Sequence, residues 1–439
     1  MKRIARGVAA LLGIAALSLV VYVIYRRVEP KPPIRVGILH SRTGPMAISE
    51  GSMIDAEVLA LEELNARGGL LGRKVEWVIV DGKSDPPTFA REAERLITEE
   101  KVSVIFGCWT SASRKSVKPV VEERDHLLVY PMAYEGVEQS PNIVYVGAAP
   151  NQQIIPAVSW CLDVLKAKKI YVVGSDYVWP RTVNEIVRDV LKARGEKLAG
   201  ESYIEFGSSA VEEAVAAIKK ADPEVILSSV VGDSNVAFYR KLRAAGITPE
   251  RTPVVSFSIA EPELRTLNAP ELAGNYAAWC YFQSLDFPEN VAFVKRLKAR
   301  YGAERVASDV MEASYNAVQL WAQAVQEAGY DDVAIVRRHL IRQSLDAPEG
   351  IVSIDAENLH AWRPFYLGKI RSDGQFDVVW SLTKPIRPVP YPQTRSKRDW
   401  ENYVENLRVS WGGSWVNPHF GERATNVNPD AGAAPRRVP

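Results

Sequence analysis

The sequence predicts a two-lobed α/β protein in which two parallel-type sheets, each flanked by helices, face each other across a hinge. Short β-branched runs alternate with amphipathic helical stretches from Ile34 onward, which is typical of βαβ units. The same alternation restarts near residue 169. Two successive arrays of similar size therefore predict two lobes, and the helical stretches that follow the second array predict that the chain crosses between them more than once.

The first array contains four expected strands separated by three expected helices. Gly68 and Gly69 end the first helix, and Pro86 and Pro87 begin the second. The strands are expected at Ile34–His40, Val75–Asp81, Val102–Cys108 and Leu127–Tyr130, and the helices at Met53–Asn65, Thr88–Glu100 and Ser113–Arg124.

The second array repeats the pattern and is followed by three longer helical stretches. Its strands are expected at Lys169–Gly174, Glu224–Val231, Val254–Ile259 and Tyr276–Phe282, and its helices at Arg181–Arg194, Ala210–Lys220 and Val236–Ala244. The later helices are expected at Val291–Arg300, Val310–Ala328 and Val333–Ser344, before a strand-rich segment, Gly350–Trp380, and a proline-rich tail with a short helix around Trp400–Leu407.

These elements predict four parts of the chain. Residues 34–149 and 285–345 are expected to form one lobe, and residues 150–284 and 346–383 the other. Residues 384–439 are expected to form a C-terminal extension that lies along the body, and residues 1–33 an N-terminal anchor and spacer.

The N-terminal segment resembles an export signal. Lys2, Arg3 and Arg6 precede an uncharged run from Val8 to Tyr25, near the lower length limit for a membrane-spanning helix. The run lacks a small-residue cleavage site at its end, which favours an uncleaved signal-anchor over a cleaved signal. We therefore expect an extracytoplasmic body, periplasmic in a bacterium with two membranes, that is anchored to the cytoplasmic membrane through a proline-rich spacer.

Composition and motifs exclude several classes of protein. The 54 Lys and Arg residues nearly balance the 53 Asp and Glu residues, so we expect no nucleic-acid partner. Three widely spaced cysteines allow at most one disulfide, and the five histidines show no metal-binding spacing, so no metal or cofactor is expected. The sequence has no nucleophile elbow, phosphate-binding loop or dinucleotide fingerprint, and we expect no enzyme.

Ligands of open parallel sheets bind beyond the carboxyl ends of the strands, so the residues that follow each strand are the candidate site. After the third strand come Trp109 and Ser111, which could wall a pocket and donate to a ligand carbonyl. The same residues also fit a helix N-cap at Ser111 or Ser113 beside a packed tryptophan. In the second array, Tyr177 and Trp179 alternate on one side of an extended run, as residues aimed into a cleft would.

Further strand ends complete a ring of aromatic, hydroxyl and acidic residues. They are the segment that begins Tyr130-Pro131-Met132, the segment that contains Asp233, and the segment that ends at Glu261. A small neutral amide needs this mixture of aromatic faces, donors and acceptors, whereas an unpaired charge in such a site would be costly.

Several segments resemble the urea-binding component of bacterial ABC importers. They are Gly107–Lys115 (GCWTSASRK), Tyr130–Gly136, Ser140–Gln153 (SPNIVYVGAAPNQQ), Gly174–Arg181 (GSDYVWPR), Gly232–Phe238 (GDSNVAF), Ser258–Glu261 and Tyr281–Ser284. The chain more distantly resembles the amide sensor of an aliphatic amidase operon and branched-chain amino-acid-binding proteins. The resemblance implies the type I periplasmic binding protein fold, with three hinge crossovers, and a permease partner.

The resemblance also implies the pocket positions. The positions of the amide sensor fall on Trp109, Ser111, Tyr130, Met132, Tyr177 and Trp179. Met132 stands where the sensor has a hydroxyl residue, and Trp179 replaces a phenol.

Two alternatives stay open at this point. An amino acid is the chief rival ligand, because Asp233 or Glu261 could bind its ammonium group, although both acids also fit the start of a helix. A membrane-tethered receptor that signals through lobe closure is the rival to a transport protein. The resemblance favours urea.

Overall fold

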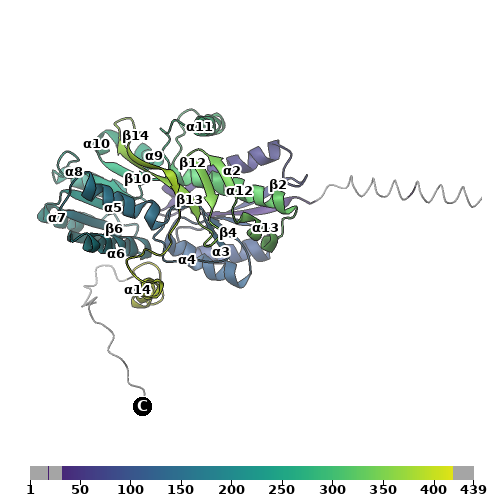
Figure 1. Cartoon of the computed structure of the whole chain (residues 1–439), viewed down its shortest axis with the longest axis horizontal. Coiled ribbons are helices and arrows are strands. Elements are labelled where there is room, and N and C mark those ends of the chain that lie inside the picture. The colour runs from purple at the N-terminus through teal and green to yellow at the C-terminus, as the bar shows by residue number, and fades with distance from the viewer. Residues whose placement is uncertain (1–17, 19–31, 419–439) are drawn as a thin grey trace, which may run out of the picture.

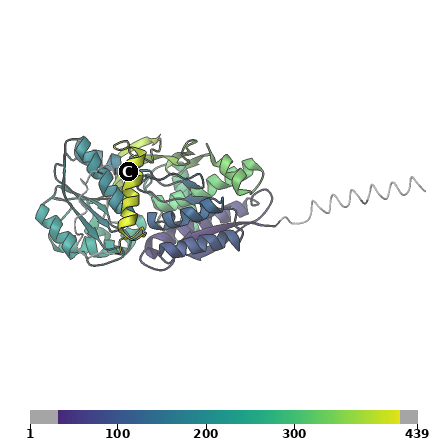
Figure 2. The same ribbon diagram turned by 90° about the horizontal axis from the view of Figure 1, so that it is seen from below.

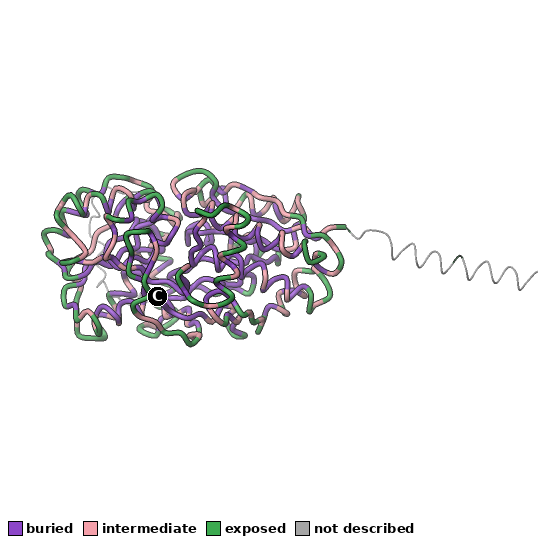
Figure 3. Tube along the Cα trace, turned by 90° about the horizontal axis from the view of Figure 1, so that it is seen from above, coloured by how far each residue is buried: buried purple, intermediate pink, exposed green. Residues whose placement is uncertain are grey.

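The computed structural model describes Ser18 and residues 32–418, which form two lobes side by side (Figure 1). Each lobe has a central sheet with helices on its faces, and buried residues fill the interior of both lobes (Figure 3). The predicted two-lobed α/β architecture is therefore confirmed. Alternating β-branched strands and amphipathic helices give this result because a parallel sheet must be covered by helices on both faces.

Lobe 1 is built on a five-stranded parallel sheet with the order β2-β1-β3-β4-β5. Helices that come later in the chain complete it, since α12 packs against α2 and against β3 and β4. The elements are β1 (Ile34–His40), α2 (Ala47–Ala66), β2 (Val75–Asp81), α3 (Pro86–Thr98), β3 (Ile105–Gly107), α4 (Ser111–Glu123), β4 (Leu128–Tyr130), β5 (Ile143–Tyr145), α11 (Pro288–Tyr301), α12 (Asp309–Ala328) and α13 (Val333–Leu340).

Lobe 2 is built on a nine-stranded mixed sheet, with the order β11-β12-β13-β10-β9-β8-β6-β7 and with β14 paired to β13. Its elements are η1 (Pro150–Gln152), α5 (Ile154–Asp163), β6 (Ile170–Ser175), α6 (Val178–Ala193), β7 (Leu198–Ile204), α7 (Glu212–Ala221), β8 (Val225–Ser229), α8 (Ser234–Ala244), β9 (Val254–Ser256), α9 (Glu261–Thr266), α10 (Ala269–Leu272), β10 (Tyr276–Trp279), β11 (Ser344–Ala347), β12 (Gly350–Ile354), β13 (Ala361–Ile370), β14 (Phe376–Ile386) and, packed against α6, α14 (Lys397–Ser410).

The chain passes between the lobes after β5, after β10 and after α13. A ring stack marks this region: His360, from the connection between β12 and β13, lies parallel to Tyr145 with ring centroids 4.2 Å apart. Tyr134 continues the stack at 5.1 Å from Tyr145. Burial lowers the pKa of His360 to about 4, so the imidazole stays neutral and packs as an aromatic ring.

Several expected elements differ from those observed. Short or weakly patterned segments were not predicted, among them β5, α5 and β7. The expected helix Val333–Ser344 ends at Leu340, and Ser344 instead begins β11, which pairs antiparallel with β12. Several helices also begin earlier than expected, as α2 does at Ala47 instead of Met53, because the start of α2 buries polar residues, Ser49, Glu50 and Ser52, which an apolar pattern does not mark.

The expected anchor, Val8–Tyr25, and the last residues of the tail lie outside the described residues. Among the residues that the structure does describe, no helix is both long and apolar enough to cross a bilayer.

A buried arginine joins the two lobes near the hinge. Arg363, in β13, donates to Glu349 at 2.7 Å and lies 3.2 Å from Asp309 and 3.0 Å from Glu312, both of which belong to α12 of lobe 1. All four side chains are fully buried. Burial raises the pKa of Glu349 to about 7, and the Arg363 charge opposes that rise.

We expect the substitution Arg363→Met to lower the free energy of unfolding by about 3–5 kcal/mol, because it leaves three buried carboxylates without their cation. The half-buried pair of Arg35 and Glu100 provides a control near the surface, and Arg35→Met should lower the free energy of unfolding by at most about 1 kcal/mol. Guanidinium chloride unfolding at pH 7.5 measures both. Equal losses for the two variants would contradict the role given to Arg363.

Candidate ligand-binding site

The strand ends of the two lobes meet at Tyr177. This residue directly precedes α6 in lobe 2, and its side chain is buried. Burial raises the pKa of Tyr177 well above its usual value, the nearby Tyr130 and Glu135 raise it further, and Arg114 opposes them. Because those three neighbours belong to lobe 1, the phenol lies within electrostatic range of the facing lobe. The candidate site is therefore the junction between Tyr177 and the ends of β3 and β4.

The loop after β3 turns the chain into α4. Thr110 is the N-cap, since its side chain accepts a hydrogen bond from Ser113 N at 3.0 Å. The alternative of an N-cap at Ser111 or Ser113 is therefore wrong by one to three residues. With Thr110 as the cap, Ser111 is the first residue of α4, and its hydroxyl is available for contacts away from the helix end.

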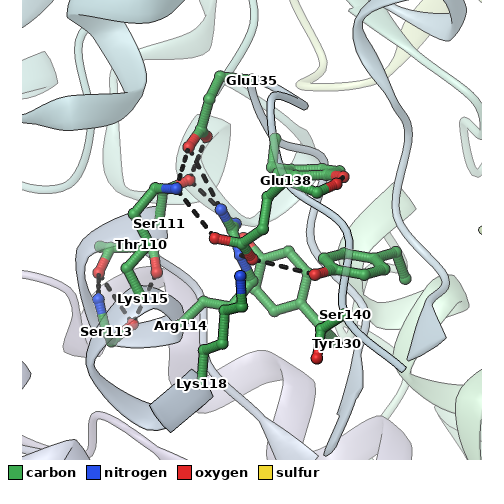
Figure 4. A network of polar contacts seen from close by, with 12 residues as sticks. Thr110, Ser111, Ser113, Arg114, Lys115, Lys118, Tyr130, Glu135, Glu138 and Ser140 are labelled. Carbon is green, nitrogen blue, oxygen red and sulfur yellow. Dashed lines mark hydrogen bonds and ion pairs between the residues drawn. The ribbon is translucent and has the colours of Figure 1, made fainter. Parts of the chain in front are cut away.

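Ser111 belongs to a buried network of charges (Figure 4). Its hydroxyl donates to Glu135 and accepts from Arg114 Nη1 at 3.1 Å. Arg114 also lies 3.2 Å from Glu135 and 2.8 Å from Glu138, and Lys115 Nζ lies 2.9 Å from Glu138. Two cations and two carboxylates thus neutralise one another in the interior of lobe 1.

Aromatic rings surround the guanidinium of this network. The Arg114 carbon Cζ lies 4.4 Å from the ring centre of Tyr134 and 4.8 Å from that of Tyr130. Burial alone would raise the pKa of Glu138, but Arg114 and Lys115 lower it well below its usual value. Each cation of the network thus contacts a carboxylate, which is how charges are kept in a dry interior.

Three further predicted residues lie at the same strand ends. Tyr130, the last residue of β4, donates its hydroxyl hydrogen to the Trp109 carbonyl at 2.7 Å. Trp109 and Met132 are both buried, each with 3% of its surface exposed. The hydrogen bond fixes the Trp109 loop against the end of β4, so the structure places Trp109, Ser111 and Tyr130 together.

Trp179 supplies an unpaired donor beside Tyr177. The two rings are 6.3 Å apart, and Trp179 is buried in the first turn of α6. Its indole Nε1 is buried without a hydrogen-bond partner. A buried N–H group without an acceptor costs about 1–3 kcal/mol, so this donor is a candidate contact for a ligand carbonyl.

The two predicted acids do not join this group. Asp233 is exposed, and although it stands at the N-cap position of α8, its side chain makes no capping hydrogen bond. Glu261 is buried, but its Oε1 atom accepts from the backbone N–H of Gln283 at 2.8 Å. This contact ties α9 to the segment after β10, and the Oε2 atom of Glu261 is buried without a donor.

Glu50, in the first turn of α2, is a further buried acid on the lobe 1 side of this junction, and the sequence pattern did not indicate it. It is fully buried, its Oε2 accepts from Ser41 N at 2.7 Å, and its Oε1 has no donor. Its charge also acts on Tyr177 across the lobe junction. The sequence does show an acid in the first turn of a helix that follows a strand, which could have indicated Glu50. An exposed acid at a helix start gives the same pattern, so the sequence does not distinguish the two.

The lobes are in contact on this side of the junction. Ser49, next to Glu50, donates to Glu263 of lobe 2 at 2.8 Å. Gly232 has a φ of +60°, and a Cβ atom there would lie 2.6 Å from the Pro45 carbonyl oxygen. Only glycine permits this approach, so the turn before α2 closes directly against lobe 2.

The site holds no recognisable metal centre. Within Ser18 and residues 32–418, no group of three or more His, Cys, Asp or Glu side chains is arranged to bind an ion. Cys108, Cys161 and Cys280 are free and buried.

Residues 34–397 match the family model described as "Periplasmic binding protein domain". The curated relatives include the Leu/Ile/Val-binding protein of Citrobacter freundii, which is 22% identical over 80% of this chain and 93% of that protein. A protein of Geobacillus stearothermophilus named limonene hydroxylase is 34% identical over 141 residues, but this match covers only 31% of the chain and 26% of that protein.

Solved structures share the fold. A solute-binding protein of an ABC transporter from Rhodopseudomonas palustris, in complex with p-hydroxybenzoic acid, has a TM-score of 0.72 and 22% identity and covers 80% of this chain and 97% of its own. Another is a branched-chain amino acid transporter substrate-binding protein from Streptococcus pneumoniae, in complex with isoleucine. It has a TM-score of 0.70 and 20% identity, and the match covers 80% of this chain and 98% of that protein.

We expect Glu261→Gln to remove part of the pH dependence of stability and to leave ligand affinity unchanged. Burial raises the pKa of Glu261 to about 8. The stabilisation by its proton is therefore complete below the unfolded-state pKa near 4.5 and is lost as the pH rises through 8. Between pH 5 and pH 9 the free energy of unfolding of the wild type should therefore fall by at least about 1 kcal/mol more than that of the variant.

Guanidinium chloride unfolding across this pH range measures the effect, with the exposed Glu289→Gln as the control. If Glu261→Gln weakened ligand binding instead, the acid would belong to the site.

Proposed function

The chain belongs to the periplasmic binding protein family, and we propose that it captures a small neutral amide, with urea as the first candidate, and delivers it to an ABC permease. One observation carries the choice of ligand. Trp179 Nε1, beside Tyr177, is a buried donor without an acceptor, and Glu50 Oε1, whose carboxylate acts electrostatically on Tyr177, is a buried acceptor without a donor. The described cations of the neighbouring network already have carboxylate partners.

The unpaired atoms match the groups of an amide. A carbonyl oxygen accepts hydrogen bonds and an NH₂ group donates them, so Trp179 suits the first and Glu50 the second. The faces of Tyr177 and Trp109 suit the flat surface of a planar molecule. A ligand whose carbonyl reaches Trp179 Nε1 and whose NH₂ group reaches Glu50 Oε1 would remove two desolvation penalties when the lobes close.

The charge balance argues against a carboxylate ligand. The named relatives bind branched-chain amino acids or p-hydroxybenzoic acid, and each of these ligands carries a carboxylate. A buried carboxylate needs a cation, but Arg114 already contacts Glu135 and Glu138. A second carboxylate would have to compete with those two, which a neutral amide does not.

The family implies an extracytoplasmic location, and we propose that residues 1–33 tether the protein to the membrane near its permease. Hinge closure around the ligand would give the permease a shape that differs from the empty protein. The same closure could serve a membrane-tethered sensor, and uptake assays with and without the permease would separate the two roles.

We expect Trp179→Phe to weaken urea binding at least about fivefold, because it removes the indole donor and keeps most of the ring. Trp321→Phe is a matched control, since Trp321 Nε1 is also buried without a partner but belongs to α12 and packs on Phe106. Tyr177→Ala and Ser111→Ala should each cost at least about 1 kcal/mol of binding free energy. Isothermal titration calorimetry measures all four variants, and unchanged urea affinity in the three site variants would contradict the proposed pocket.

A ligand panel tests the substrate class directly. Urea and acetamide should bind to the purified protein, and leucine and 4-hydroxybenzoate should bind at least about tenfold more weakly, because each would bury a charge without a free partner. Tighter binding of leucine than of urea would overturn the assignment.

The mature N-terminus tests the tether. Intact-mass spectrometry of the membrane fraction should show a chain that retains Val8–Tyr25. A mature chain that starts near Glu29 would instead identify the segment as a cleaved signal.

A further inference from the structure

The chain after β14 contacts both lobes before it reaches its last described residues. Asn151 and Asn358 of lobe 2 donate to the carbonyls of Arg387 and Pro388 at 2.8 and 3.2 Å. The tail then lies on lobe 1, where the Pro390 carbonyl accepts a hydrogen bond from Val137 N at 2.7 Å. Gly136 is held closely there, since a Cβ atom on it would lie 2.1 Å from the same oxygen.

Helix α14 then packs on α6 of lobe 2. Arg395, just before the helix, lies 2.7 Å from Asp189, and the Tyr403 hydroxyl donates to the Arg181 carbonyl at 3.1 Å. Trp400 is fully buried in this contact. Figure 2 shows α14, in yellow, at the junction between the two lobes.

The segment Ser414–Asn417, called the latch below, is bound to the strand end that carries Tyr177. The Trp415 carbonyl accepts from Val178 N at 3.0 Å, and Val416 forms a β-bridge with Tyr177. Asn417 donates its side-chain amide to Asp176 at 2.7 Å and its backbone N–H to the Asp176 carbonyl at 3.2 Å. A free N–H group at the start of α6 is thus satisfied by the tail.

The ring of Trp415 faces the opposite lobe. Lys115 Nζ, of α4 in lobe 1, lies 5.1 Å from its ring centre. The backbone of the latch is therefore fixed to lobe 2, while its largest side chain contacts the charged network of lobe 1.

We propose that the latch holds the two lobes closed over the ligand site and slows the exchange of ligand. The inference rests on the proposed function only for the identity of the ligand. A hinge rotation that moves Tyr177 away from lobe 1 must carry Trp415 with it, because several hydrogen bonds join the latch to residues 176–178. The contact between Trp415 and Lys115 is then lost, and so opening requires more free energy than in a protein without the latch.

The same rotation also acts on the start of the tail. Pro390 is bound to lobe 1 and Arg395 to lobe 2, with four residues between them. This short connection limits how far the lobes can separate unless one of its two ends is released.

Distance measurements between spin labels test the latch in the full chain. Labels on Glu123→Cys in lobe 1 and Lys220→Cys in lobe 2 report the separation of the lobes, because both positions are exposed and the three native cysteines are buried. Release of radiolabelled urea reports ligand exchange. The test variant is Trp415→Ala/Asn417→Ala, and the control is Val409→Ala, an exposed position on α14.

We expect the double variant to populate longer distances without ligand and to release urea about tenfold faster, and the control to match the parent. Unchanged distances and release would overturn the latch. Faster release with unchanged distances would also overturn it, since the segment would then be only a wall of the site. If the parent does not bind urea, the proposed function fails while the distances still decide the latch. If the double variant does not fold, the distances and the release of urea are measured on Asn417→Ala alone.

Discussion

The burial of Arg114 is the constraint on which the ligand site depends. A guanidinium without water must be neutralised and hydrogen-bonded, and Glu135 and Glu138 fulfil both needs. Satisfying Arg114 fixes the loop that follows β4, because both acids lie in that loop. It also fixes Ser111 and the first turn of α4, so the rigid half of the site is set by charge neutralisation inside lobe 1.

Arg363 is a second buried guanidinium that must be neutralised by carboxylates. Its carboxylate partners come from α12 of lobe 1 and from the turn before β12, whereas Arg363 itself is in the sheet of lobe 2. The Arg114 network shapes one lobe, and the Arg363 network joins two. A buried charge near the hinge resists sliding of the lobes, because any misplacement leaves carboxylates unpaired. Rotation about the crossovers is then the motion that remains.

The sequence predicted those elements whose formation depends on the local pattern of residues. Ile34–His40 and Val75–Asp81 match the observed strands residue for residue, because both runs are rich in β-branched residues, which favour strands. The structure brings Trp109 and Tyr130 together at the strand ends of lobe 1, and Tyr177 and Trp179 at the end of β6 in lobe 2, because the carboxyl ends of parallel strands lie at one edge of a sheet. The sequence did not predict which acids are buried. Asp233 is exposed, while Glu50, Glu135 and Glu138 are buried, and only the tertiary partner of a carboxylate decides between these outcomes.

An uncharged ligand changes how binding must work. Long-range attraction contributes little to the capture of such a ligand, and the free energy has to come from contacts made as the lobes close. A small amide offers few atoms, and the best small ligands gain only about 1.5 kcal/mol per heavy atom. Contacts within the protein that favour the closed form raise the apparent affinity for such a ligand, because they reduce the cost of closure. A tail that joins Trp415 to Lys115 is therefore most useful to a protein whose ligand is small and uncharged.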